Sequence, residues 1–291
     1  MKNIKVTDIA KAFGISRQTF YNRRNKYFQF ENQIKIIRSK VLKVRKRQPR
    51  IGGRKLIYLL QDDFKKEGIS IGRDKFFSLL ASEFLLVKPL RNSVRTTKRA
   101  KRFRQYPNLI QNREVNRPEQ VWVSDVTYVH HKQGTSYLHL TTDLYSKKIV
   151  GFKLADNIKA DTTLTVIKKA LKKRLYPNRK LIHHSDRGFN YTAASFTQFL
   201  NNNKIKISMT NKYDPYENAI AERVNGILKQ EFSISDPKHQ RTEIENVIKQ
   251  AIYIYNNERP HLSCNYLTPN QAHKLGRYKL PKWSKFNFSK N

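Results

Sequence analysis

Residues 121–129, with the sequence VWVSDVTYV, decide the expected fold of this chain. Valine, tryptophan and tyrosine give this run a β-strand pattern, and Asp125 lies inside it. Four more strand patterns follow along the chain, at residues 135–146, 147–155, 180–186 and 204–210. Two helical patterns are interleaved with them, at residues 160–175 and 217–232. Strands first, then strands that alternate with helices, predict an α/β fold with a mixed sheet flanked by helices.

The composition indicates a polyanionic partner. The 291 residues include 59 Lys and Arg but only 22 Asp and Glu, which gives a formal net charge of +37. Because cationic side chains release condensed counterions when they neutralise phosphates, nucleic acid is the leading partner class. A ribosomal-type structural role and binding to a membrane surface remain alternatives. The sequence shows no apolar run of about 18 residues and no hydrophobic signal region at the N-terminus, so we expect a cytoplasmic protein that does not span a membrane.

Cysteine chemistry is limited. Cys264 is the only cysteine, so the chain can form neither an internal disulfide nor a multi-cysteine zinc site.

The first 30 residues have the pattern of a helix-turn-helix. An apolar helical run ends at Gly14, and Ser16 can cap a second helix. That second helix would present Arg17, Gln18 and Asn22 to a major groove of DNA. A plain packing hairpin is the alternative.

The rest of the front portion is also expected to be helical and basic. Residues 31–87 carry leucine and phenylalanine stripes beside Arg73 and Lys75, so this segment serves either as a second DNA-binding region or only as a core. With the helix-turn-helix it would form an all-α N-terminal DNA-binding region. Residues 88–117 are expected to be a basic linker along the phosphate backbone, or a solvated tether. Its candidate contacts are Lys98, Arg99, Lys101 and Arg102.

Three carboxylates are candidates for chemistry. Asp125 lies in the first strand, Asp186 follows the strand at 180–186, and Glu222 lies on the helix at 217–232. Each has an ordinary explanation, as an outward-facing strand residue, a turn former and a solvated glutamate. Together they can hold two divalent cations, which bind hard oxygen ligands and can clamp both oxygens of a phosphodiester exchange.

These segments carry a family resemblance. VWVSDVTYV, HHSDRGFNYT, the 35-residue interval between Asp186 and Glu222, ENAIAERVNGILKQEF and YNNERPHLSCNYLTP together resemble the integrase-core transposases of bacterial insertion sequences, in the insertion sequence family three group. The resemblance covers roughly residues 50 to 275. Two departures concern Glu217, where the family usually has Asp, and Asn190, where it more often has Gln. Both substitutions keep a polar side chain and remove no candidate metal ligand.

The resemblance implies a ribonuclease-H-like catalytic core at residues 118–235, followed by a helical and basic extension at 236–291. Asp125, Asp186 and Glu222 would be both the catalytic and the metal-binding residues, with two Mg²⁺ or Mn²⁺ ions. Lys229 matches a basic position expected to contact terminal DNA, and Arg259 lies in a further motif that either contacts DNA or stabilises a helix end. Of His183 and His184, one is expected to be a packed strand residue, and a role in orienting water or metal is the alternative.

The expected function is that of a transposase, which binds the ends of a mobile element and catalyses metal-dependent cleavage and transfer of DNA strands. Two competing interpretations are an inactive DNA-binding regulator derived from such an element and a ribonuclease-H-type nuclease. The expected partner is double-stranded DNA, bound by a homo-oligomer that is associated with the bacterial nucleoid. An upstream protein encoded by the same element is a further possible partner.

Overall fold

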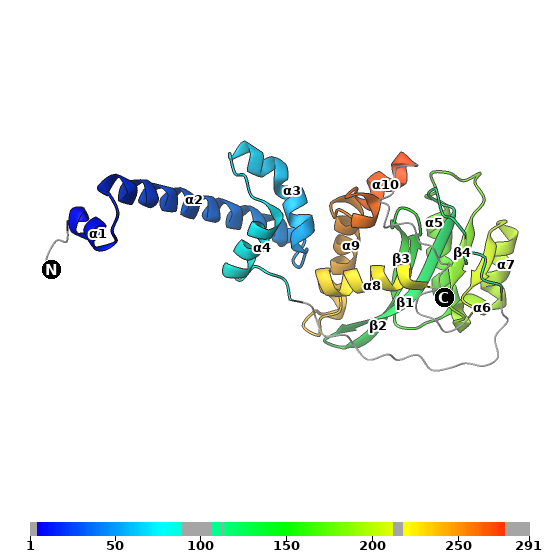
Figure 1. The fold of residues 1–291 in the computed structure, drawn as a ribbon. Helices are drawn as coiled ribbons and strands as arrows, with labels where there is room; N and C mark the ends of the chain where they lie inside the picture. The colour runs from blue at the N-terminus through cyan, green and yellow to red at the C-terminus, as the bar shows by residue number, and fades with distance from the viewer. Residues whose placement is uncertain (1–4, 89–105, 112, 212–217, 277–291) are drawn as a thin grey trace. The chain divides into compact units, whose positions relative to one another are not determined.

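The computed structural model describes residues 5–88, 106–111, 113–211 and 218–276 (Figure 1). They divide into two compact units. The first unit comprises residues 1–47 and 51–88, and the second comprises residues 48–50 and 89–291. The candidate contacts Lys98, Arg99, Lys101 and Arg102 lie outside the described residues. None of the described helices is long and apolar enough to cross a bilayer.

The first unit is helical. Its helices are α1 (Val6–Ala12), α2 (Arg17–Arg47), α3 (Gly53–Lys66) and α4 (Arg73–Ser82). The amide of Thr19 donates to Oγ of Ser16 over 3.1 Å, which is the cap predicted for the second helix. That helix runs for 31 residues and continues through residue 30, because residues 17–47 contain neither glycine nor proline.

Apolar stripes from three helices close the core of this unit. Ile37 and Val41 of α2 are buried against residues of α3 and α4. Of the leucines and phenylalanines expected to be core residues, Leu59 is only partly buried, and five are buried, namely Leu56, Leu60, Phe76, Leu79 and Leu80. Gly68, with a φ of 64°, makes the left-handed turn that separates α3 from α4.

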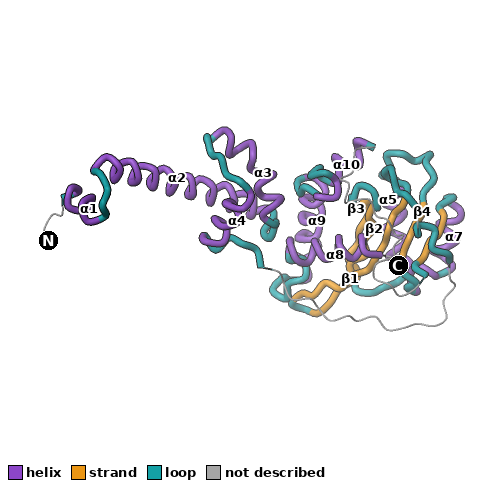
Figure 2. The backbone as a smooth tube through the Cα atoms, in the orientation of Figure 1, coloured by secondary structure: helices purple, strands orange, loops and turns teal. Residues whose placement is uncertain are grey.

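The second unit is built on a five-stranded sheet with the order β3-β2-β1-β4-β5. The strands are β1 (Val121–His131), β2 (Gly134–Asp143), β3 (Ile149–Ala155), β4 (Ile182–Ser185) and β5 (Lys206–Met209) (Figure 2). Strands β1, β2 and β3 are antiparallel, whereas β4 is parallel to β1 and β5 is parallel to β4. The predicted α/β class with a mixed sheet is confirmed.

Helices cover both faces of this sheet (Figure 1). They are α5 (Ala160–Leu171), α6 (Phe189–Thr192), α7 (Ala194–Asn202), α8 (Ala219–Phe232), α9 (Arg241–Asn257) and α10 (Pro269–Leu275), with a 3-10 turn at Leu262–Cys264. Leu138 and Leu140 of β2 pack with α8 and α9 on one face. Trp122 of β1 packs with α5 and α7 on the other. The alternation of β1 therefore sends neighbouring side chains into two different cores.

Candidate active site

The parallel pairing of β1 with β4 places two of the candidate carboxylates level with each other. Val121, Trp122 and Val123 pair with Ile182, His183 and His184, a constant offset of 61 residues. The same offset carries Asp125 to Asp186, one residue beyond the end of β4. Because adjacent strands lie about 4.8 Å apart, this register brings two carboxylates that are distant in sequence close to each other, at the carboxyl end of β4.

The electrostatics of Asp125 show that negative charge is concentrated there. Burial, together with the negative charges of Asp186 and Glu222, raises the pKa of Asp125 to about 7. Burial also raises the pKa of Asp186, although that residue as a whole is exposed. All three candidate carboxylates thus act within one local field, and Asp125 lies innermost.

Helix α8 packs beside Asp125 and bonds its carboxylate. Val224 and Leu228 are buried on its apolar side, as the predicted stripe requires. Glu222 lies in the first turn of the helix. One turn later, Nδ2 of Asn225 donates to Oδ2 of Asp125 over 2.7 Å. Lys229 follows one further turn along, and burial lowers its pKa while the charge of Asp125 opposes that shift.

Asp186 is held by the turn that follows it. The Gly188 amide donates to Oδ1 of Asp186 over 3.0 Å, so the aspartate also serves as the turn former considered from the sequence. A Cβ on Gly188 would lie 2.8 Å from Oδ1 of Asn190 and 3.0 Å from Oδ1 of Asp186, so the turn has no room for a side chain. Asn190 is buried and donates to Oγ1 of Thr163, which fixes α6 against α5.

The donor chemistry of this site fits a divalent cation. The carboxylates offer hard oxygen atoms, and the pKa of Asp125 is raised chiefly by burial and further by the negative charges of Asp186 and Glu222, so a cation bound there would favour its charged form. In the described part of the chain, no three histidine, cysteine, aspartate or glutamate side chains already stand together as a metal-binding group. The structure therefore brings Asp125 and Asp186 level and Glu222 within electrostatic range, without arranging a finished ligand set.

The two histidines beside Asp186 are both structural. His183 and His184 are buried, and each bonds a serine hydroxyl over 2.8 Å, Ser124 for the first and Ser208 for the second. Burial, with a contribution from His184, lowers the pKa of His183 to about 3, so its ring is neutral at physiological pH.

Comparison with known proteins identifies the family. Two models of the integrase core domain match residues 115–215 and 203–269. The chain is 32% identical to the insertion element IS600 31 kDa protein of Shigella sonnei over 267 residues, which cover 90% of this chain and 96% of that protein. The chain belongs to the integrase-core transposases of bacterial insertion sequences. It is also 33% identical to the transposase of IS904 from Lactococcus lactis, over 58% of this chain and 67% of that one.

Solved structures of retroviral proteins resemble the transposase as well. The integrase catalytic core of HTLV-2, in complex with magnesium, has a TM-score of 0.44 and 22% identity, and covers 54% of this chain and 97% of that one. An intasome chain of simian T-cell lymphotropic virus has a TM-score of 0.49 and 18% identity, over 80% and 74% of the two chains. The mixed sheet of this transposase is the ribonuclease-H-like fold expected from its motifs.

The N-terminal residues predicted to contact DNA are exposed. Gln18 and Asn22 lie one turn apart on α2, and Nε2 of Gln18 donates to Oδ1 of Asn22 over 3.1 Å. The guanidinium of Arg17 lies 5.6 Å from the ring centre of Tyr21. Arg73 and Lys75 are exposed at the start of α4. Arg73 bonds Asp74 over 2.8 Å, while Lys75 lies over the ring of Phe30.

Arg259 requires a correction. Its side chain is only 1% exposed, and Nε and Nη2 both donate to the carboxylate of Glu231 over 2.7 Å. A guanidinium enclosed in this way is not available to a phosphate, so the structure favours the alternative role. Arg259 ties the chain after α9 to the end of α8.

Asn225 is the site residue that the motif analysis did not select. It shares a face of its helix with Glu222, three residues earlier, and that spacing was visible in the sequence. Its bond to Asp125 joins residues 100 positions apart, which only the docking of α8 on β1 reveals.

Proposed function

We propose that this transposase binds the ends of a mobile DNA element and cuts and rejoins strands with divalent metal ions held by Asp125, Asp186 and Glu222. The family establishes a polynucleotidyl transferase of the DDE type. The assignment to these residues rests chiefly on the pKa of Asp125, which burial and two neighbouring carboxylates raise to about 7. Two Mg²⁺ or Mn²⁺ ions at this site would polarise the phosphodiester and activate water or a 3′-hydroxyl.

The side chains around the carboxylates have distinct tasks in this proposal. Asn225 fixes one oxygen of Asp125 and so orients the carboxylate for a cation. The amide of Gly188 orients Asp186 in the same manner. Lys229, one turn beyond Asn225, offers a positive charge to the phosphate next to the reacting bond. Glu222, in the first turn of α8, completes the set.

The N-terminal unit and the oligomer supply recognition. Arg17, Gln18 and Asn22 on α2, together with Arg73 and Lys75 on α4, are proposed to contact the terminal DNA. Joining one end of an element to another requires two ends in one complex, so we propose that a homo-oligomer assembles on the DNA.

An Asp186→Asn variant tests the assignment. It should abolish Mg²⁺-dependent cleavage of a duplex that carries the element end, because the amide loses the negative charge that binds the ion, while gel-shift binding stays near the wild-type level. The matched control is Asp161→Asn, which changes an exposed aspartate in the first turn of α5. Retained cleavage by Asp186→Asn would refute the assignment. Cleavage confined to RNA-DNA hybrids, without strand transfer, would instead favour the ribonuclease alternative.

A further inference from the structure

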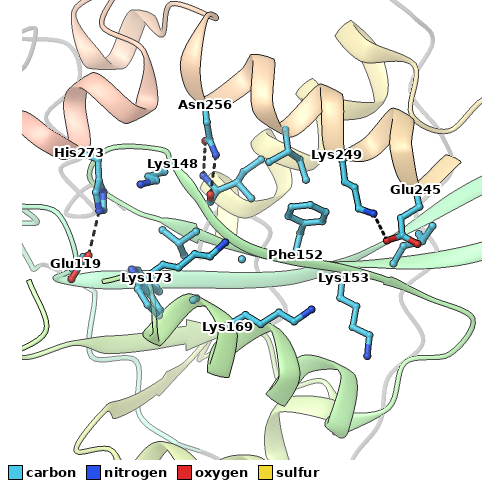
Figure 3. Close-up of a pocket in the computed structure, with 17 residues that line it drawn as sticks. Glu119, Lys148, Phe152, Lys153, Lys169, Lys173, Glu245, Lys249, Asn256 and His273 are labelled. Carbon is cyan, nitrogen blue, oxygen red and sulfur yellow. Dashed lines mark hydrogen bonds and ion pairs between the residues drawn. The ribbon is translucent and has the colours of Figure 1, made fainter. Parts of the chain in front are cut away.

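A basic groove lies along the open edge of the sheet in the second unit, away from the carboxylates. Strand β3 pairs with β2 on one side only, and a hollow of about 530 Å³ runs beside it between α5 and α9 (Figure 3). Five lysines line this hollow, which we call the lysine groove: Lys148, Lys153, Lys169, Lys173 and Lys249. The candidate catalytic residues are not among its lining residues.

The lysines reach the groove from three directions. Lys153 lies on β3, Lys169 lies on α5 and Lys249 lies on α9. The close packing of α5 on β3 makes this possible, because a Cβ on Gly151 would lie 2.9 Å from Val166 of α5. Lys169 and Lys173, one helical turn apart, therefore stand beside the strand edge.

Within the described residues, ion pairs engage few of these lysines, although the charge of Lys169 also acts on Glu245 and those of Asp143 and Glu119 act on Lys148. Nζ of Lys249 lies 2.8 Å from Oε1 of Glu245. In the described part of the chain, no carboxylate is within ion-pair distance of Lys153, Lys169 or Lys173. Glu119, the other acid in the lining, is already bonded to Arg174 and His273. Like charges gathered in this way favour an anionic occupant.

Two observations argue against an ordinary edge-strand explanation. Lysine on an edge strand deters pairing with another strand, but Lys169, Lys173 and Lys249 do not belong to β3. In addition, the side chain of Asn256 bonds both the amide and the carbonyl of Ile149 over 3.0 Å (Figure 3). The first residue of β3 is thus closed to an added peptide strand.

We propose that the lysine groove is a second DNA-binding surface, which holds the sugar-phosphate backbone of duplex DNA outside the reacting phosphodiester. The proposal rests on the proposed function only in that the partner is DNA. Lysine is a flexible point charge suited to phosphates of any sequence, so this surface positions the duplex without reading bases. The lysine groove thus adds to the affinity for DNA that the N-terminal unit provides.

The test compares two triple variants of the full chain that each lose three lysines. Lys153→Gln, Lys169→Gln and Lys173→Gln alter the groove. The matched control changes Lys168, Lys172 and Lys206 to glutamine, which are exposed lysines outside its lining. Binding to a short fluorescent duplex of arbitrary sequence is measured by anisotropy at several salt concentrations, with EDTA present so that no strand is cut.

The groove variant should bind about tenfold more weakly, and its slope of log affinity against log salt should be shallower by about 2 to 3, because each lost phosphate contact contributes about 0.9. The control should lose less than half as much. Acetylation of lysines, mapped by mass spectrometry on the wild-type protein, should show protection by DNA at residues 153, 169 and 173 and none at 168 and 172.

Equal slopes for the two variants, or equal protection of both lysine sets, would overturn the proposal. A groove variant that loses self-association in sedimentation while its salt slope is unchanged would overturn it in favour of a second copy of the chain. Neither result depends on cleavage, so each is distinguishable from failure of the Asp186→Asn test.

Discussion

Replacement of Arg259 by alanine should strongly destabilise the second unit without lowering the affinity of the protein for DNA. The guanidinium is 1% exposed and makes two bonds of 2.7 Å to Glu231, whose side chain is 15% exposed. Removal of one partner from a buried ion pair typically costs about 3 to 5 kcal/mol. The amides of α8 and α9 should then exchange with solvent about a hundredfold to a few thousandfold faster, because each 1.4 kcal/mol corresponds to about a factor of ten.

Hydrogen exchange followed by mass spectrometry measures this effect, and two controls make it specific. Arg241→Ala removes an ion pair with Asp156 that is largely exposed, at 3.0 Å, and should cost less than about 1 kcal/mol. The double variant Arg259→Met with Glu231→Leu replaces both charges of the pair by apolar side chains, so it should be more stable than Arg259→Ala. An exchange rate near wild type for Arg259→Ala, accompanied by a shallower salt dependence of DNA binding, would refute the structural role and restore Arg259 as a DNA contact.

Three further predictions concern other parts of the chain. Asn225→Ala removes the donor to Asp125 and should lower cleavage about 10- to 100-fold at limiting Mg²⁺ with little change in melting temperature, and a metal titration equal to wild type would contradict it. Burial raises the pKa of Glu119, but hydrogen bonds from its neighbours outweigh burial and hold it at about 2, below the usual 4.5. The ionised carboxylate therefore contributes its full stabilisation above about pH 4.5 and loses it as the pH falls towards 2. The melting temperature of Glu119→Gln should lack this part of the decrease between pH 4.5 and 2. Ser16→Ala removes the acceptor for the Thr19 amide and should cost the start of α2 about 1 kcal/mol, measurable as faster local exchange.

The five strands of the second unit and its helices α5 and α8 could be predicted because their patterns are local. The valine, tryptophan and tyrosine residues of VWVSDVTYV specify a strand, and the apolar stripe of ENAIAERVNGILKQEF specifies a helix and the face that it buries. The family motifs also set the approximate positions of Asp125, Asp186 and Glu222. In the first unit, the absence of glycine and proline from residues 17–47 already permitted one continuous helix, although the segment looked like two.

Contacts between distant segments could not be predicted in this way. The sequence left Arg259 with two alternative roles, a DNA contact or a residue that stabilises a helix end, because its environment depends on how α8 and α9 pack. The lysines at the end of α5 illustrate the same limit. Lys168 and Lys169 lie in its last turn and Lys172 and Lys173 directly follow it, and nothing local shows that Lys169 and Lys173 line the groove beside β3.

The amide of Asn256 has a consequence for how this protein behaves in a crowded cell. By bonding the amide and the carbonyl of Ile149, a single side chain takes the place of a neighbouring strand at the first residue of β3, which is an edge strand of the five-stranded sheet. Where copies gather on one stretch of DNA at high local concentration, that end of β3 is thus closed to pairing with a strand of another copy.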